Sequence, residues 1–186
     1  MSPPGENIMK TRREFLQGLI VSVGGATALS ACSGAATIAA TAPGQRGRFY
    51  TGNEIALLSR ICDLIIPRTE TPGALDANVP GYLDGLMTDW ASDETRSIHR
   101  KALQLIAARL DAASGNFLSA SEETAVRVLT ELDSNAFSGG GLAGYRSLKG
   151  YITRAYFATE EGAMEELKWV ALPGRWDPSV DISAGD

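Results

Sequence analysis

Side chains that commonly carry out chemistry in proteins are scarce in this sequence. His99 is the only histidine, and it lies in a charged run with Arg96, Arg100 and Lys101, which predicts a solvated helix face. Zinc sites use clusters of His or Cys, which this sequence lacks. A Ser-His-Asp triad would have to use His99, and nothing else in the sequence supports one. The two cysteines are also too few for an iron–sulfur cluster and do not form a covalent haem motif.

Carboxylates are the remaining candidates for acid–base chemistry. Two carboxylates can perform it when their surroundings separate their pKa values, but no pair stands out here. Asp63 is the most notable, since it lies near the end of an apolar helical pattern, where a hydrogen bond or a partner such as Arg68 would explain it. The glycine-rich run 139–144 lacks the spacing of a phosphate-binding loop and is interpreted as a helix connector. We therefore expect no catalytic, cofactor or metal site in this chain.

An N-terminal pattern has a better-defined function. Thr11, Arg12 and Arg13 are followed after one residue by Phe15 and Leu16, which is the order of a twin-arginine export signal. Such signals are recognised by a receptor and do not themselves anchor the protein. The pattern therefore predicts export by the twin-arginine translocase.

The segment after this pattern predicts cleavage and lipidation. Residues 18–31 are too few and too polar to span a bilayer, for which about 20 apolar residues are needed. They end in Leu-Ser-Ala-Cys, which resembles a lipobox, and in such sites the cysteine becomes the lipidated first residue of the mature chain. We expect residues 1–31 to be a signal peptide, and the mature protein to be a periplasmic lipoprotein that is anchored to the membrane at Cys32.

The composition of the mature chain narrows its class. Residues 32–48 are rich in Ala, Ser, Thr and Gly with little to bury, which predicts a flexible tether. Cys62 would be the only free thiol, and its apolar helical surroundings predict a small buried hydrophobe. The net charge of the full sequence, −5, argues against nucleic-acid binding, which needs a basic face.

The periodicity of residues 49–186 is helical, and no segment shows sustained alternation with a period of two. We predict one all-α domain of five to six helices with an extended C-terminal arm. The first helix begins at a capping box from Thr51 to Glu54 and stops at Pro67. Later helices are expected from Asn78 or Val79, from about Asp93 to Ala113, from a capping box at Ser119 to Glu122, through Tyr145 to Tyr156, and near Glu160 to Val170. The apolar face of the third comprises Ile98, Ala102, Leu105, Ile106 and Leu110.

Two stretches resemble a known family. Residues 57–74 combine an apolar helix, Asp63, two aliphatic residues, Pro67, a Thr-rich loop and a Pro-Gly-Ala run, like the opening of the gluconate 2-dehydrogenase subunit 3 family. Residues 156–163, Tyr-Phe-Ala-Thr-Glu-Glu-Gly-Ala, resemble its closing motif, with a Leu-Pro-Gly run at 172–174 beyond it. The resemblance spans about Phe49 to Trp176, nearly the whole mature domain.

The resemblance implies a non-catalytic small subunit of a membrane-associated sugar or sugar-acid dehydrogenase. In such complexes a large subunit similar to glucose–methanol–choline (GMC) oxidoreductases carries FAD and the active site, and a multihaem cytochrome c often accepts the electrons. The small subunit carries the export signal for both, and members with a lipobox resemble the small subunits of glucoside 3-dehydrogenases. The alternative is a free-standing periplasmic lipoprotein that serves as a binding or adhesion module. The first interpretation predicts an apolar surface too large for a monomer.

Two segments outside the regular helical pattern form a candidate interface with the large subunit. Arg and Trp, which occur in the second segment, are enriched among interface hot spots. For Trp176 the alternative is packing against its own domain. The candidate residues are Pro67, Pro72, Gly73, Ala74, Pro173, Gly174, Arg175 and Trp176.

Overall fold

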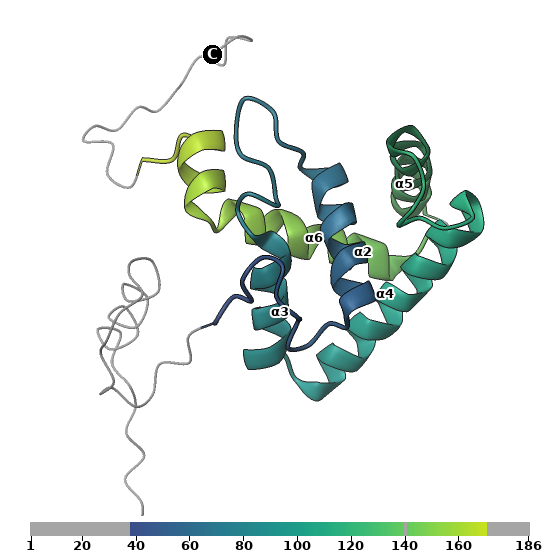
Figure 1. Cartoon of the computed structure of the whole chain (residues 1–186), viewed down its shortest axis with the longest axis horizontal. Helices are drawn as coiled ribbons and strands as arrows, with labels where there is room; N and C mark the ends of the chain where they lie inside the picture. Colours follow the sequence, from purple (N-terminus) through teal and green to yellow (C-terminus); the bar gives the residue numbers. More distant parts are fainter. Residues whose placement is uncertain (1–37, 140, 171–186) are drawn as a thin grey trace, which may run out of the picture.

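The computed structural model of the chain describes residues 38–139 and 141–170. This part contains no strand, which confirms the all-α prediction. None of its helices is long and apolar enough to cross a membrane. The elements are α2 (Gly52–Ile65), α3 (Val79–Asp89), α4 (Asp93–Ser114), α5 (Glu122–Phe137), α6 (Ala143–Phe157) and a π-helix, η1 (Glu161–Glu166) (Figure 1). The signal peptide, Cys32 and residues 171–186 lie outside the described residues.

Helix α6 is central to the packing of the domain. It packs against α3, α4 and α5, and it also contacts η1, while α2 packs against α3 and α5 (Figure 1). Their shared core is apolar and includes Cys62, as predicted. Burial raises the pKa of the Cys62 thiol, and the neighbouring Asp63 adds to the rise, so the thiol stays protonated and unreactive. The largest fully buried side chains are Tyr50, Leu58, Ile61, Leu83, Met87, Leu103, Ile106, Leu110, Phe117, Tyr145, Leu148 and Tyr156.

The helix boundaries follow local signals, with one correction. The capping box is present at the start of α2, where Thr51 and Glu54 each accept the other's backbone N–H. The capping box predicted at Ser119 is wrong. Ser121 caps α5 instead by accepting the N–H of Thr124, because Ser119 takes part in a turn with Asn116.

The buried face of α4 differs from the prediction. His99 is buried, and its Nε2 lies 2.7 Å from the hydroxyl of Tyr50, whereas the sequence predicted a solvated histidine. Ile98 and Leu105, predicted to be buried, are 61% and 58% exposed. The actual stripe contains His99, Leu103, Ile106 and Leu110, which also have helical spacing. The hydrogen bond from a distant segment makes burial of the imidazole possible, and the local charge pattern does not reveal it.

Part of the predicted tether is packed against α3. The buried carboxylate of Asp84 accepts a hydrogen bond from the Thr41 hydroxyl and from three consecutive backbone N–H groups, those of residues 48, 49 and 50. Arg48 forms an ion pair with Asp89, and the N–H of Thr41 donates to the carbonyl of Gly81. The prediction of a flexible tether is therefore wrong where the segment bonds to α3, at Ala39, Thr41 and Arg48, whereas residues 42–46 are exposed. Its contacts are polar and use the backbone, so the low apolar content of the segment gave no signal of them.

Candidate functional site

The loop between α2 and α3 has a defined conformation. Arg68 forms an ion pair with Asp76, which also accepts the N–H of Gly73 at 2.8 Å. Hydrogen bonding to Arg68, and to that N–H, lowers the pKa of Asp76, so the pair persists at neutral pH. The predicted pairing of Asp63 with Arg68 is wrong. Asp63 is exposed on α2, and Arg68 bonds to Asp76 instead.

Two of the four candidate interface residues in this loop have an internal role. A Cβ atom on Gly73 would lie 2.6 Å from the backbone nitrogen of Arg68, so a side chain there would force the loop open. Ala74 is fully buried, and its N–H donates to the carbonyl of Ile66 at 2.9 Å. Pro67 is exposed and Pro72 is half-buried, so only these two remain available to a partner. Candidate residues 173–176 lie outside the described part of the chain.

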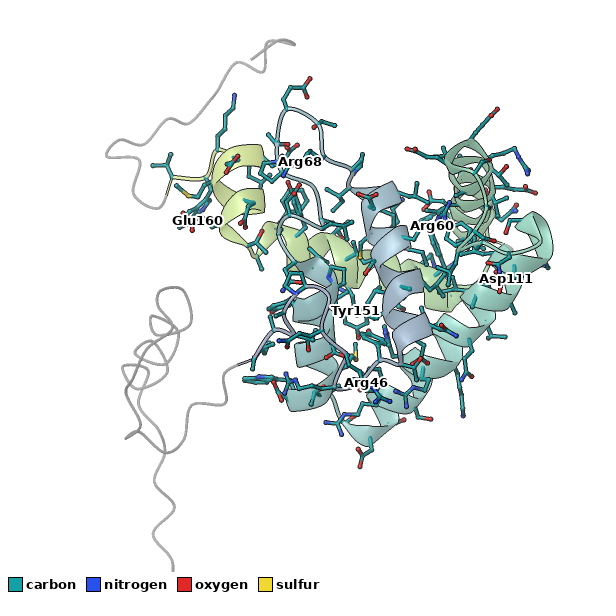
Figure 2. The ribbon with its side chains drawn as sticks, viewed as in Figure 1. Arg46, Arg60, Arg68, Asp111, Tyr151 and Glu160 are labelled. Atoms are coloured by element: carbon teal, nitrogen blue, oxygen red, sulfur yellow. The ribbon has the colours of Figure 1, made fainter. Side chains whose placement is uncertain are left out.

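The structure brings together the two stretches that carry the family resemblance. The hydroxyl of Tyr156, at the end of α6, donates to the carbonyl oxygen of Pro72 at 2.6 Å. The hydroxyl of Thr71 lies 2.6 Å from a carboxylate oxygen of Glu166 in η1. Figure 2 shows the result, with Arg68 on the loop and Glu160 beside η1 at the same end of the molecule. The loop and η1 therefore form one surface, although they are distant in sequence.

The π-helix depends on a close backbone approach. Gly162 is buried, and a Cβ atom there would lie 2.2 Å from the carbonyl oxygen of Tyr156. The Thr159 hydroxyl accepts the N–H of Gly162 and donates to the same Tyr156 carbonyl. The Thr and Gly of the closing motif thus shape the turn from α6 into η1. π-Helical turns are rare and frequently occur at functional sites.

Large apolar side chains are exposed at this end of the chain. We call the set formed by Phe157, Met164, Leu167, Trp169 and Val170 the C-terminal apolar patch, and each member is between 39% and 62% exposed. The backbone after η1 is held in place, because the N–H of Leu167 donates to Gly162 and that of Trp169 to Ala163. Four glutamates, at 160, 161, 165 and 166, are interspersed with the patch.

This patch has the character of an interaction site. Exposed apolar groups that are rimmed by polar residues commonly mark protein–protein contacts. The sequence predicted a short helix near Glu160 to Val170, but its exposed apolar residues were not among the predicted interface residues. The sequence offered no signal for this site, because the exposure of Met164, Leu167, Trp169 and Val170 is a property of the folded domain.

Among the described residues, the arrangement offers apolar surface to which a partner could bind. Within residues 38–139 and 141–170, no three His, Cys, Asp or Glu side chains gather in a way that would hold a metal ion. The only histidine is buried against Tyr50, and burial lowers its pKa to about 4, so it is neutral at physiological pH.

One comparison with known proteins gives a match. The sequence model of the family described as Gluconate 2-dehydrogenase subunit 3 matches residues 52–174, which is well over half of the chain. No curated protein and no solved structure matches. The matched region begins with α2 and includes both the loop and η1.

Proposed function

Since the chain belongs to the gluconate 2-dehydrogenase subunit 3 family, we propose that it is the non-catalytic small subunit of a periplasmic dehydrogenase that oxidises a sugar or a glucoside. The observation that carries this proposal is the C-terminal apolar patch next to the Pro67–Pro72 loop. A free-standing binding module would have less reason to expose five large apolar side chains at one end of the chain.

The partner in this proposal is a GMC-type flavoprotein large subunit that holds FAD and the active site. Its docking surface combines apolar pockets for Met164, Leu167 and Trp169 with basic residues opposite the four glutamates. Apolar anchors supply most of the affinity in such interfaces, whereas charges at the rim mainly guide association and select the partner. In this proposal a cytochrome c that accepts the electrons binds the large subunit, which holds the FAD.

The export pattern gives the small subunit a second role. A flavoprotein takes up FAD when it folds, so it needs a route that exports folded proteins. We propose that Arg12, Arg13, Phe15 and Leu16 direct this chain to the twin-arginine translocase and that the large subunit is exported while bound to it. Lipidation at Cys32 then holds the complex at the membrane, since a mature lipoprotein carries more than the single acyl chain that binds only marginally.

Two pairs of aspartate substitutions test whether the large subunit binds at the C-terminal apolar patch. Met164→Asp with Leu167→Asp places two carboxylates in the patch and should abolish co-purification of the large subunit. The matched control is Leu105→Asp with Val126→Asp, which changes two similarly exposed apolar residues on α4 and α5. The control should retain the partner. Equal loss in both variants, or retention in both, would contradict docking at the patch.

A further inference from the structure

A second surface of the chain is rich in positive charge, in contrast to the C-terminal apolar patch with its four glutamates. An open groove of about 620 Å³ lies between the segment before α2 and the N-terminal half of α4. Four of its lining residues are cationic and one is a carboxylate, in a chain whose net charge is −5. The lining residues are Arg48, Phe49, Asp93, Arg96, Ser97, Arg100, Lys101 and Gln104.

Backbone carbonyl groups help to hold two guanidinium groups of the groove, those of Arg96 and Arg100. Arg96 donates to the carbonyl oxygens of Met87 and Thr88 at the end of α3, at 2.7 and 2.6 Å. Arg100 donates to the carbonyl of Phe49 at 2.6 Å and lies over its ring at 4.3 Å. Carbonyl partners fix the geometry without cancelling the charge, so the cations are pre-organised for an anion.

Carboxylates compensate only part of this charge. Arg48 pairs with Asp89 at 2.9 Å, Arg96 with the exposed Asp93 at 3.1 Å, and Arg100 with Glu54 at 3.5 Å. Lys101 is exposed and forms no ion pair with any residue that the structure describes. The arginines still have donors that these contacts do not use, because a guanidinium offers five.

The groove lies beside the point where the N-terminal segment reaches the domain. Arg48, in the groove wall, donates to the carbonyl of Ala39, and the N–H of Ala39 donates to Asp89. Cys32 lies six residues before Ile38, a span of at most about 20 Å. Two exposed apolar residues lie close by in the chain, namely Trp90 at the end of α3 and Ile98 on α4, at 56% and 61% exposure. Tryptophan with Lys and Arg is the combination that proteins present to a membrane interface.

We propose that this groove binds the phosphate groups of anionic phospholipids and so seats the domain on the membrane surface. The proposal rests on the proposed function for the lipid anchor at Cys32, and on the groove's own residues for the binding chemistry. In Figure 1 the N-terminal end of α4 lies at the bottom of the folded part, whereas η1 lies at its upper left. Seating by the groove would thus leave the C-terminal apolar patch free for the large subunit.

Charge reversal at the groove tests this proposal with the full chain. Lys101→Glu and Arg127→Glu change the net charge equally, but Arg127 is an exposed residue of α5 outside the groove. A basic residue near an anionic surface contributes about fivefold to binding, so reversal at Lys101 should weaken co-sedimentation with phosphatidylglycerol vesicles about tenfold or more. Arg127→Glu should stay within about twofold of the unaltered chain, and phosphatidylcholine vesicles should bind little of any variant. Circular dichroism confirms that each variant is folded.

Several outcomes would overturn the proposal. Equally weakened vesicle binding by Lys101→Glu and Arg127→Glu would show that only the net charge of the chain matters. Equal binding to phosphatidylglycerol and phosphatidylcholine vesicles would show that the anionic headgroup is not what the groove recognises. Saturable binding of inorganic phosphate at constant ionic strength, without a preference for phosphatidylglycerol vesicles, would assign the groove to a free anion. The assay needs neither lipidation nor the large subunit, so a failure here leaves the proposed function untouched if the partner still co-purifies.

Discussion

The hydroxyl of Tyr156 donates a 2.6 Å hydrogen bond to the carbonyl oxygen of Pro72, 84 positions earlier in the chain. Burial raises the pKa of Tyr156, and the nearby Glu166 adds to the rise, so the hydroxyl keeps the proton that it donates. Through this bond the last turn of α6 fixes the position of the loop that precedes α3. This bond, with that between Thr71 and Glu166, therefore joins the loop to the segment that carries the C-terminal apolar patch.

Tyr156→Phe should loosen this surface without unfolding the domain. It removes the donor and leaves the Pro72 carbonyl without its partner, which should cost about 1–2 kcal/mol of unfolding free energy. Co-purification of the large subunit should fall as well. Tyr151→Phe is the control on the same helix, because the Tyr151 ring packs near His99 and its hydroxyl makes none of the hydrogen bonds described here. Urea unfolding and affinity capture measure both effects, and unchanged capture by Tyr156→Phe would contradict the coupling of loop and patch.

Asp84→Asn should detach the segment before α2. Burial alone would raise the pKa of Asp84, but four hydrogen bonds to the carboxylate outweigh it and lower the pKa. The carboxylate therefore contributes stability that is present above the unfolded pKa of about 3.9 and is lost as pH falls through the lower folded value. The substitution should cost on the order of 3 kcal/mol at neutral pH, with a much smaller loss for the exposed Asp89→Asn. A loss no larger than that of Asp89→Asn in denaturant unfolding would refute this role.

His99 should make stability depend on pH in a different range. Burial, with a smaller effect from Arg100, lowers its pKa to about 4, although Glu54 opposes the shift. The unfolded chain binds the proton first, near pH 6.5, so stability should fall as pH drops from about 6.5 towards 4. Since this is the only histidine, its imidazole resonances can be followed directly by NMR. Titration near 6.5 in the folded protein would contradict the buried, neutral state, and His99→Gln should flatten the dependence.

The sequence predicted the parts of this structure that rest on local rules. The helices, the capping box at Thr51 and the buried Cys62 follow from periodicity and from hydrogen bonding within a few residues. Three features were not predicted from the sequence, because they depend on residues that are distant in the chain. His99 is buried because the Tyr50 hydroxyl bonds to it, and Ile98 is exposed because α4 turns the His99 stripe towards the core. Thr41 and Arg48 are held against α3 because Asp84 accepts their hydrogen bonds.

The candidate site was likewise predicted only in part. The Pro67–Ala74 loop was identified through its resemblance, but only tertiary structure separates the internal residues Gly73 and Ala74 from the accessible Pro67. The π-helical form of η1 was not predicted, since its i+5 bonding depends on Gly162 fitting against the end of α6. The apolar patch became recognisable only when its exposure was known.

Export should depend on the arginine pair. Arg12→Lys with Arg13→Lys should leave this chain in the cytoplasm, and the large subunit with it, because recognition of the pair by the translocase requires both arginines. The measurement is dehydrogenase activity in periplasmic and cytoplasmic fractions. Arg109→Lys with Arg127→Lys makes the same chemical change within the folded domain and should leave the distribution unaltered. Periplasmic activity that survives the first pair of substitutions would show that the large subunit does not depend on this chain for export.

The central claim is that this chain is a subunit whose cofactor and active site reside in a partner. The most direct measurement is affinity purification of the full chain from solubilised membranes, followed by a visible absorption spectrum and mass spectrometry of the eluate. We expect a flavin spectrum and a large GMC-type chain in stoichiometric amount, both lost in the Met164→Asp, Leu167→Asp variant. A stable monomer that elutes without flavin and without a second chain would contradict it.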